Sequence, residues 1–92
     1  MTIYLLVDGA ERRQRFMREL QDYLAEDGRV YGAEQHDGTG VLQEVLIDVH
    51  AAENDADAIE RIQPFTMRWP EREHIVGGTT AMTLLVPPPA MR

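Results

Sequence analysis

The sequence predicts an α+β fold, in which two helices pack on one face of an antiparallel β-sheet. Three observations lead to this prediction. Apolar residues recur at every second position in short runs, they recur at helical spacing in two other stretches, and these segments follow the order β-α-β-β-α-β. Right-handed crossovers between the strands would place both helices on the same face of the sheet.

The first strand is expected over residues 2–7, and both of its faces are apolar. Ile3, Leu5 and Val7 fall on one face, while Tyr4 and Leu6 fall on the other. A strand that is apolar on both faces is typical of the interior of a sheet. We therefore expect this strand to have a neighbour on each side.

Residues 9–27 have the spacing of an amphipathic helix. Asp8 and Glu11 have the spacing of a capping box, which predicts that the Asp8 side chain accepts a hydrogen bond in the first turn. Gly28 is expected to end the helix. The apolar residues lie in one arc about 120° wide; they are Phe16, Met17, Leu20, Tyr23 and Leu24.

Two further strands, over residues 29–35 and 41–50, are predicted to form a hairpin around the glycine-containing turn of residues 36–40. In the second of them, Val45, Ile47 and Val49 share one face with Val41 and Gln43. The opposite face carries Leu42, Glu44, Leu46, Asp48 and His50.

The second half of the chain is less regular. A helix is expected over residues 53–63, capped by Asn54 or Asp55 and ended by Pro64, with a thin apolar stripe of Ala52, Ala56, Ile59 and Ile62. Residues 65–69 read as a short strand, and residues 74–86 as a bent strand or hairpin that adds an extra β segment. Residues 1–86 then form one domain with the element order of a ferredoxin-like sandwich, followed by a proline-rich tail over residues 87–92.

Composition excludes several classes of protein. The 92-residue chain has no cysteine, so disulfides, thiolate metal sites and thiol nucleophiles are excluded. A formal charge of −7 argues against nucleic-acid binding, because binding to phosphates needs a surplus of basic groups. No apolar run is long enough to span a membrane. We expect a soluble, cytoplasmic protein that binds no membrane.

The sheet face turned away from the helices is the most informative feature for function. Tyr4, Leu6, Leu42, Leu46 and Leu85 are expected on this face, and no remaining segment is long enough to form a second layer over them. An apolar patch of several hundred Å² is large for a monomer and marks an interaction site. We therefore expect a protein partner or a homodimer at this open face.

An acidic segment adds to this expected contact surface. Residues 44–60 contain six acidic side chains and no arginine or lysine, and the acids expected to contact a partner are Glu44, Asp48, Asp55 and Asp57. Together, the open face and the acidic segment predict a non-catalytic protein-binding module, such as a small acidic adaptor, inhibitor or regulatory subunit. The sequence has no nucleotide-binding, hydrolase or metalloprotease motif, and we expect no cofactor and no metal.

Two alternative functions remain open from the sequence. Asp48 and His50 lie two apart on a strand and can act as a proton-transfer pair, which would suit a small dimeric enzyme with a cavity on the sheet face. Gly9, Arg12 and Arg13 lie at the start of the first helix. Positive charge in the first turn interacts unfavourably with the helix dipole, and a bound anion would offset this interaction. That corner would suit a small-ligand sensor.

Overall fold

The computed structural model describes residues 2–37 and 40–78, with the backbone alone for residues 35–37 and 40–42. Its α+β class confirms the prediction. The elements are strand β1 (Thr2–Val7), helix α1 (Ala10–Leu24), strands β2 (Gly28–Asp37) and β3 (Gly40–Val49), helix α2 (Asp55–Arg68) and strand β4 (Ile75–Gly78), with 3₁₀ turns at Ala25–Asp27 and Arg72–His74.

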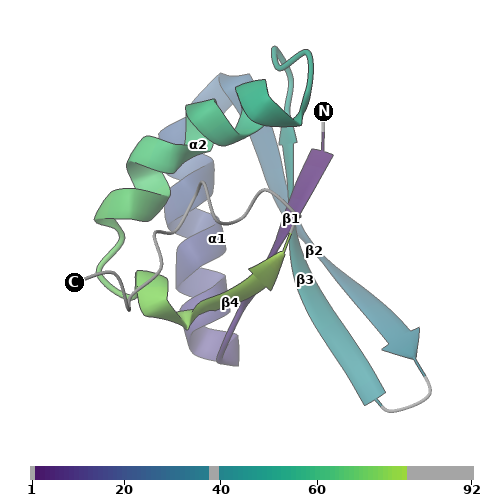
Figure 1. Cartoon of the computed structure of the whole chain (residues 1–92). Helices are drawn as coiled ribbons and strands as arrows, with labels where there is room; N and C mark the ends of the chain where they lie inside the picture. The colour runs from purple at the N-terminus through teal and green to yellow at the C-terminus, as the bar shows by residue number, and fades with distance from the viewer. Residues whose placement is uncertain (1, 38–39, 79–92) are drawn as a thin grey trace.

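The four strands form one antiparallel sheet in the order β2-β3-β1-β4. β1 therefore lies between two neighbours, as its apolar faces predicted. Both helices pack on the same face of the sheet (Figure 1). β1 pairs with β3 only from Val45 to Asp48, so the distal half of the β2–β3 hairpin projects beyond β1 and away from the helices (Figure 1).

The core lies between the sheet and the two helices, on the face that the alternation predicted. The core residues of β1 and β3 are Ile3, Leu5, Val7, Val45, Ile47 and Val49, and those of the helices include Phe16, Leu20, Leu24, Ala58, Ile59 and Ile62. The ring of Phe16 packs edge-on against Trp69 at 4.8 Å and against Phe65 at 5.6 Å between ring centroids. These aromatic contacts join α1 to the end of α2.

The predicted bounds and cap of the first helix were wrong. α1 ends at Leu24, three residues earlier than expected, and the chain turns through Ala25 at a φ of 50°. Gly28 is the first residue of β2 and not the end of the helix. Gly9 occupies the N-cap position, and no side chain caps this helix, so the capping box predicted from Asp8 and Glu11 does not form.

The second helix is longer than the sequence predicted. The Asn54 side chain caps it by accepting a hydrogen bond from the Asp57 N–H at 3.0 Å, which confirms one of the two predicted caps. Pro64 does not end the helix, and residues 65–69, which were predicted to be a strand, form its last turn and the residue after it. The reason is packing, because Ile62, Thr66 and Trp69 continue the buried stripe at helical spacing.

The remaining predictions on secondary structure are met in part. β2 runs to Asp37 and β3 starts at Gly40, so both strands extend into the segment 36–40 that was predicted to be a turn. The buried alanine of α2 is Ala58, whereas Ala56 is exposed. β4 occupies residues 75–78 of the predicted segment 74–86, and the rest of that segment and the predicted tail lie outside the described residues.

Candidate functional site

The candidate site is the sheet face turned away from both helices, which we call the far face. Figure 1 shows that no described helix covers it. Alternation with the buried core residues places these described residues on it: Thr2, Tyr4, Leu6, Arg29, Tyr31, Ala33, Glu44, Leu46 and Asp48.

An apolar row crosses the middle of the far face. Leu46 on β3 lies directly opposite Tyr4 on β1 and Tyr31 on β2. Tyr4 is 37% exposed, and Tyr31, Leu46 and the neighbouring Leu6 are half-buried. Side chains opposite one another on neighbouring strands pack together, so these residues form one continuous apolar surface.

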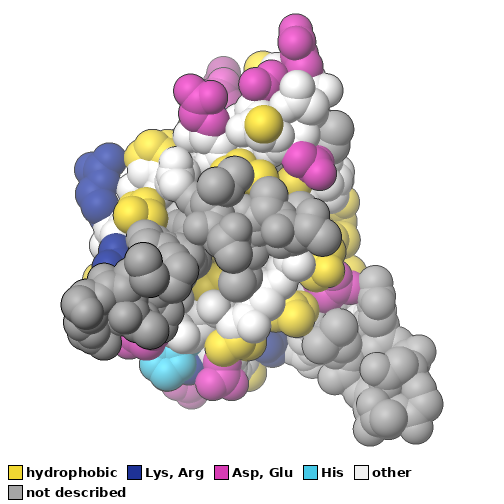
Figure 2. All heavy atoms as spheres, viewed as in Figure 1, with side chains coloured by type: hydrophobic (Ala, Val, Ile, Leu, Met, Phe, Trp, Pro, Cys, Tyr) yellow, Lys and Arg dark blue, Asp and Glu magenta, His cyan; other side chains and the backbone are white. Residues whose placement is uncertain are grey.

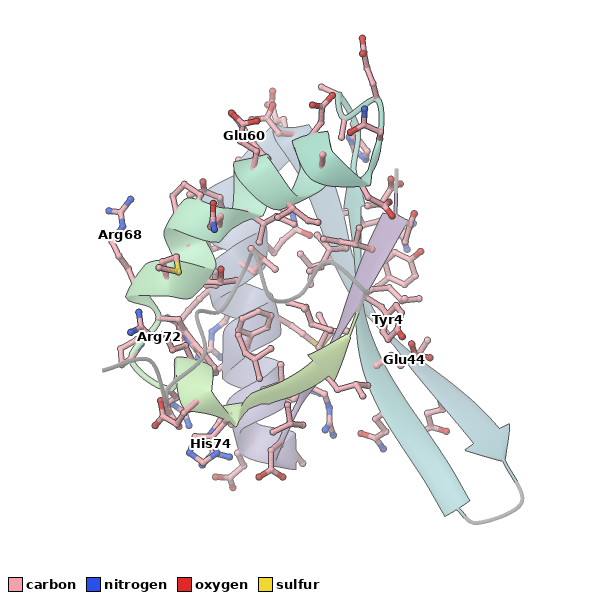
Figure 3. All side chains as sticks on the ribbon, in the orientation of Figure 1. Tyr4, Glu44, Glu60, Arg68, Arg72 and His74 are labelled. Atoms are coloured by element: carbon pink, nitrogen blue, oxygen red, sulfur yellow. The ribbon has the colours of Figure 1, made fainter. Side chains whose placement is uncertain are left out.

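Charged residues lie on either side of the apolar row. On one side, Arg29 pairs with Asp48 across the ladder, and the Arg29 guanidinium lies 5.1 Å from the centre of the Tyr31 ring. On the other side is Glu44, which Figure 3 labels beside Tyr4 on the side away from the helices. Glu44 is only 5% exposed, so its predicted role in partner contact can involve little of its surface.

Leu42 and Leu85 were also predicted for this face. The side chain of Leu42 and the whole of Leu85 lie outside the described residues. Conversely, Tyr31 and Arg29 extend the far face although sequence reasoning did not single them out. Tyr31 follows Val30 in the strand, so alternation alone puts Tyr31 on the face opposite to Val30. Placing Tyr31 beside Leu46 requires the register between β2 and β3.

The part of the acidic segment that follows β3 lies at the end of the molecule where α2 begins, and acidic side chains gather there in Figure 2. Asp55 and Asp57 are both exposed in the first turn of α2. Asp57 also accepts a hydrogen bond from the Glu53 N–H at 3.3 Å. A hollow beside this turn is lined by Asp27, Val49, Ala51, Ala52, Asp57, Glu60 and Arg61.

Asp48 and His50 are close together but exposed. Asp48 Oδ2 lies 4.0 Å from His50 Nε2, and 56% of the His50 side chain is exposed. The pair lies at the rim of the sheet, and neither residue lines the hollows beside Ala52, Trp69 and Met17. The exposure of His50 at the rim therefore weakens the alternative of an enzyme with this pair inside a cavity.

The arginines of the corner predicted to bind an anion have partners within the protein. Arg12 donates through Nε to Glu71 Oε2 at 2.6 Å and through a terminal nitrogen to the Asp8 carbonyl at 2.7 Å. Arg13 donates to Gln43 Oε1 and to the Val7 carbonyl. Gly9, with a φ of 87°, lies against the Arg12 guanidinium.

Glu71 joins this corner to the segment before β4 and was missed from the sequence. Its carboxylate accepts hydrogen bonds from Arg15 and Arg12, both at 2.6 Å. These bonds lower the pKa of Glu71 from an ordinary value of 4.5 to about 2, with Arg15 the larger cause. The partners are 56 and 59 residues apart in sequence, which explains why local spacing could not reveal them.

This low pKa predicts a pH-dependent contribution of Glu71 to stability. The folded pKa lies below the ordinary value, so the contribution is complete above about pH 4.5 and is lost as the pH falls towards 2. A Glu71→Gln variant should therefore be less stable than wild type at pH 7, and the difference should shrink towards zero near pH 2. Urea unfolding of both proteins at several pH values measures this difference. A constant difference across that range would contradict the assignment.

Within the described part of the chain, no group of three or more histidine, aspartate and glutamate side chains is arranged to hold a metal ion. Neither described helix combines the length and apolar character that crossing a membrane requires. Comparison of the chain with protein-family models, curated proteins and solved structures gives no match.

Proposed function

We propose that this protein is a non-catalytic protein-binding module, a small acidic adaptor, inhibitor or regulatory subunit, that contacts its partner through the far face. The observation that carries the proposal is the apolar row of Tyr4, Leu46 and Tyr31, which no described helix covers. The strand order, read from the other edge as β4-β1-β3-β2, supports the accompanying proposal of a ferredoxin-like sandwich.

The charges around the row favour a basic partner. Asp48 lies at one end of the far face, and the chain leads from there into the exposed acids of the α2 start, Asp55 and Asp57. With a formal charge of −7, the protein would attract a basic surface and repel another acidic one. Charges at the rim of an interface mainly speed association, so binding should weaken at high salt.

The test is a substitution in the middle of the apolar row. Leu46→Asp places a charge where an apolar contact is expected, and burying that charge on binding should weaken affinity by about a hundredfold or more. The partner is first captured on immobilised wild-type protein and identified by mass spectrometry. Its affinity for each purified variant is then measured by calorimetry.

Ala10→Asp is the matched control, because it adds the same charge at an exposed position on α1, outside the far face. It should bind the partner as wild type does. Circular dichroism confirms that both variants are folded before binding is compared. If Leu46→Asp binds like Ala10→Asp, the interface lies elsewhere and the proposal is wrong.

A further inference from the structure

The outer edge of β2 is a second surface suited to binding protein, distinct from the far face. β2 is an edge strand of ten residues, and its pairing with β3 continues without a register shift. It contains neither proline nor lysine. Bulges, prolines, charged side chains and covering by a helix are means by which proteins keep edge strands from pairing with other chains. β2 has no bulge and no proline, but Gln21 of α1 covers its edge at Gly28 and Val30, so the open part of this edge begins at Gly32.

The side chain of Gln21 shows which backbone groups of β2 point outward. Gln21 Oε1 accepts a hydrogen bond from the Val30 N–H at 2.8 Å, and Gln21 Nε2 donates to the Gly28 carbonyl at 3.1 Å. The amide of Gln21 thus binds this edge as a peptide group of an added strand would. Since alternate residues direct their backbone groups to the same side, Gly32 is the next residue to direct its N–H and carbonyl outward.

A hollow lies beside this part of the edge, between α1 and β2. Arg13, Gln14 and Met17 line it from the helix, Gly32, Ala33 and Glu34 line it from β2, and Gln43 and Glu44 line it from β3. Met17 is half-buried, and its Cε would lie 3.6 Å from a Cβ at Gly32. The outward backbone of Gly32 and an apolar side chain are therefore next to each other. Glu34 lies exposed at the rim, where its carboxylate accepts a hydrogen bond from Gln43 Nε2 at 3.5 Å.

We propose that the outer edge of β2 at Gly32 binds an extended strand of a different, basic protein. The backbone of that strand pairs with Gly32, an aliphatic side chain packs on Met17, and a basic side chain lies beside Glu34. A second copy of this chain fits less well, because α1 lies against the same edge through Gln21 and would meet its counterpart. Two copies, each of charge −7, would also repel each other.

The probe is a synthetic peptide, acetyl-Ala-Arg-Val-Arg-Val-Arg-Ala-amide, titrated into the ¹⁵N-labelled full chain. We expect amide shifts at Met17, Gly32 and Ala33 that saturate with peptide concentration. The control is the same peptide methylated on every backbone nitrogen, which keeps the charges but cannot pair. It should bind at least about tenfold more weakly. Absence of shifts at these residues at millimolar peptide, or equal binding of the methylated peptide, would overturn the proposal.

A pair of variants tests the same contact from the protein side. Gly32→Pro removes the outward N–H without removing a ladder hydrogen bond to β3, which an edge strand tolerates. Gly32→Ala keeps that N–H, and its methyl group would be in ordinary contact with Met17. We expect the proline variant to bind the peptide at least about tenfold more weakly than the alanine variant. Equal affinity of the two variants would overturn the proposal.

Two further measurements separate this inference from other outcomes. Leu46→Asp should leave peptide binding unchanged, so failure of the proposed function and failure of this inference are distinguishable. Sedimentation velocity of the free protein tests whether a second copy of this chain binds the β2 edge instead. A dimer that Gly32→Pro dissociates would show that a second copy binds this edge, and would overturn the assignment to a different protein.

Discussion

Replacing Phe16 by alanine is expected to lower the free energy of unfolding by about 3–5 kcal/mol. Phe16 is fully buried and contacts the rings of Phe65 and Trp69, so the change leaves a cavity where α1 meets the end of α2. A domain of this size has a total stability of about 5–15 kcal/mol, so the loss is a large part of it. Urea unfolding followed by fluorescence of Trp69, the single tryptophan, measures the change.

Phe16→Leu is the matched control for this prediction. Leucine keeps much of the apolar volume, and the loss of stability should be about half that of the alanine variant. If Phe16→Ala lost less than about 1 kcal/mol, the aromatic contacts could not be the main link between the helices. The far face is on the other side of the sheet, so partner binding by the folded fraction should not change.

The sheet and its buried face were predictable because burial of one face fixes a strand's register. Ile3, Leu5 and Val7 could only point to the core together, and shifting the strand by one residue would have exposed all three. The same alternation placed Tyr4 and Leu46 on the far face. These inferences need only the neighbouring residues of one strand, which the sequence supplies.

The corner at the start of α1 was not predictable because its contacts are distant in sequence. Asp8 and Glu11 have capping-box spacing, yet the Asp8 side chain lies near His74 and its carbonyl accepts from Arg12. Glu71 lies 59 residues from Arg12, so no local pattern could pair them. An arginine that lacks a neighbouring acid is therefore weak evidence for a ligand site.

The second prediction with a large expected effect concerns Pro64, which was expected to end α2 and instead lies inside it. Proline has no N–H to donate to the carbonyl of Glu60, and inside a helix it costs about 3 kcal/mol relative to alanine. α2 nevertheless continues through it to Arg68. Both Pro64 and Glu60 are exposed, so water can reach the Glu60 carbonyl, to which residue 64 donates no hydrogen bond. Burial of Ile62, Thr66 and Trp69 supplies the compensating stabilisation.

Pro64→Ala should therefore stabilise the protein. The substitution restores one helical hydrogen bond. It also increases the conformational entropy of the unfolded chain, which offsets about 0.4–1 kcal/mol of the gain. We expect a net increase of about 2 kcal/mol in the free energy of unfolding, and a rise in melting temperature of roughly 8–16 °C. Thermal unfolding followed by circular dichroism at 222 nm measures both the melting temperature and the helix content.

Pro70→Ala is the control that separates the helix effect from the general effect of removing a proline. Pro70 is exposed and lies after the end of α2, so its replacement only frees the unfolded chain and should lower stability by no more than about 1 kcal/mol. The two substitutions should thus act in opposite directions. If Pro64→Ala is no more stable than Pro70→Ala, the helix ends before residue 64. In that case Thr66 and Trp69 cannot extend its buried stripe, and the link between α1 and α2 through Phe16 must be weaker than the ring contacts indicate.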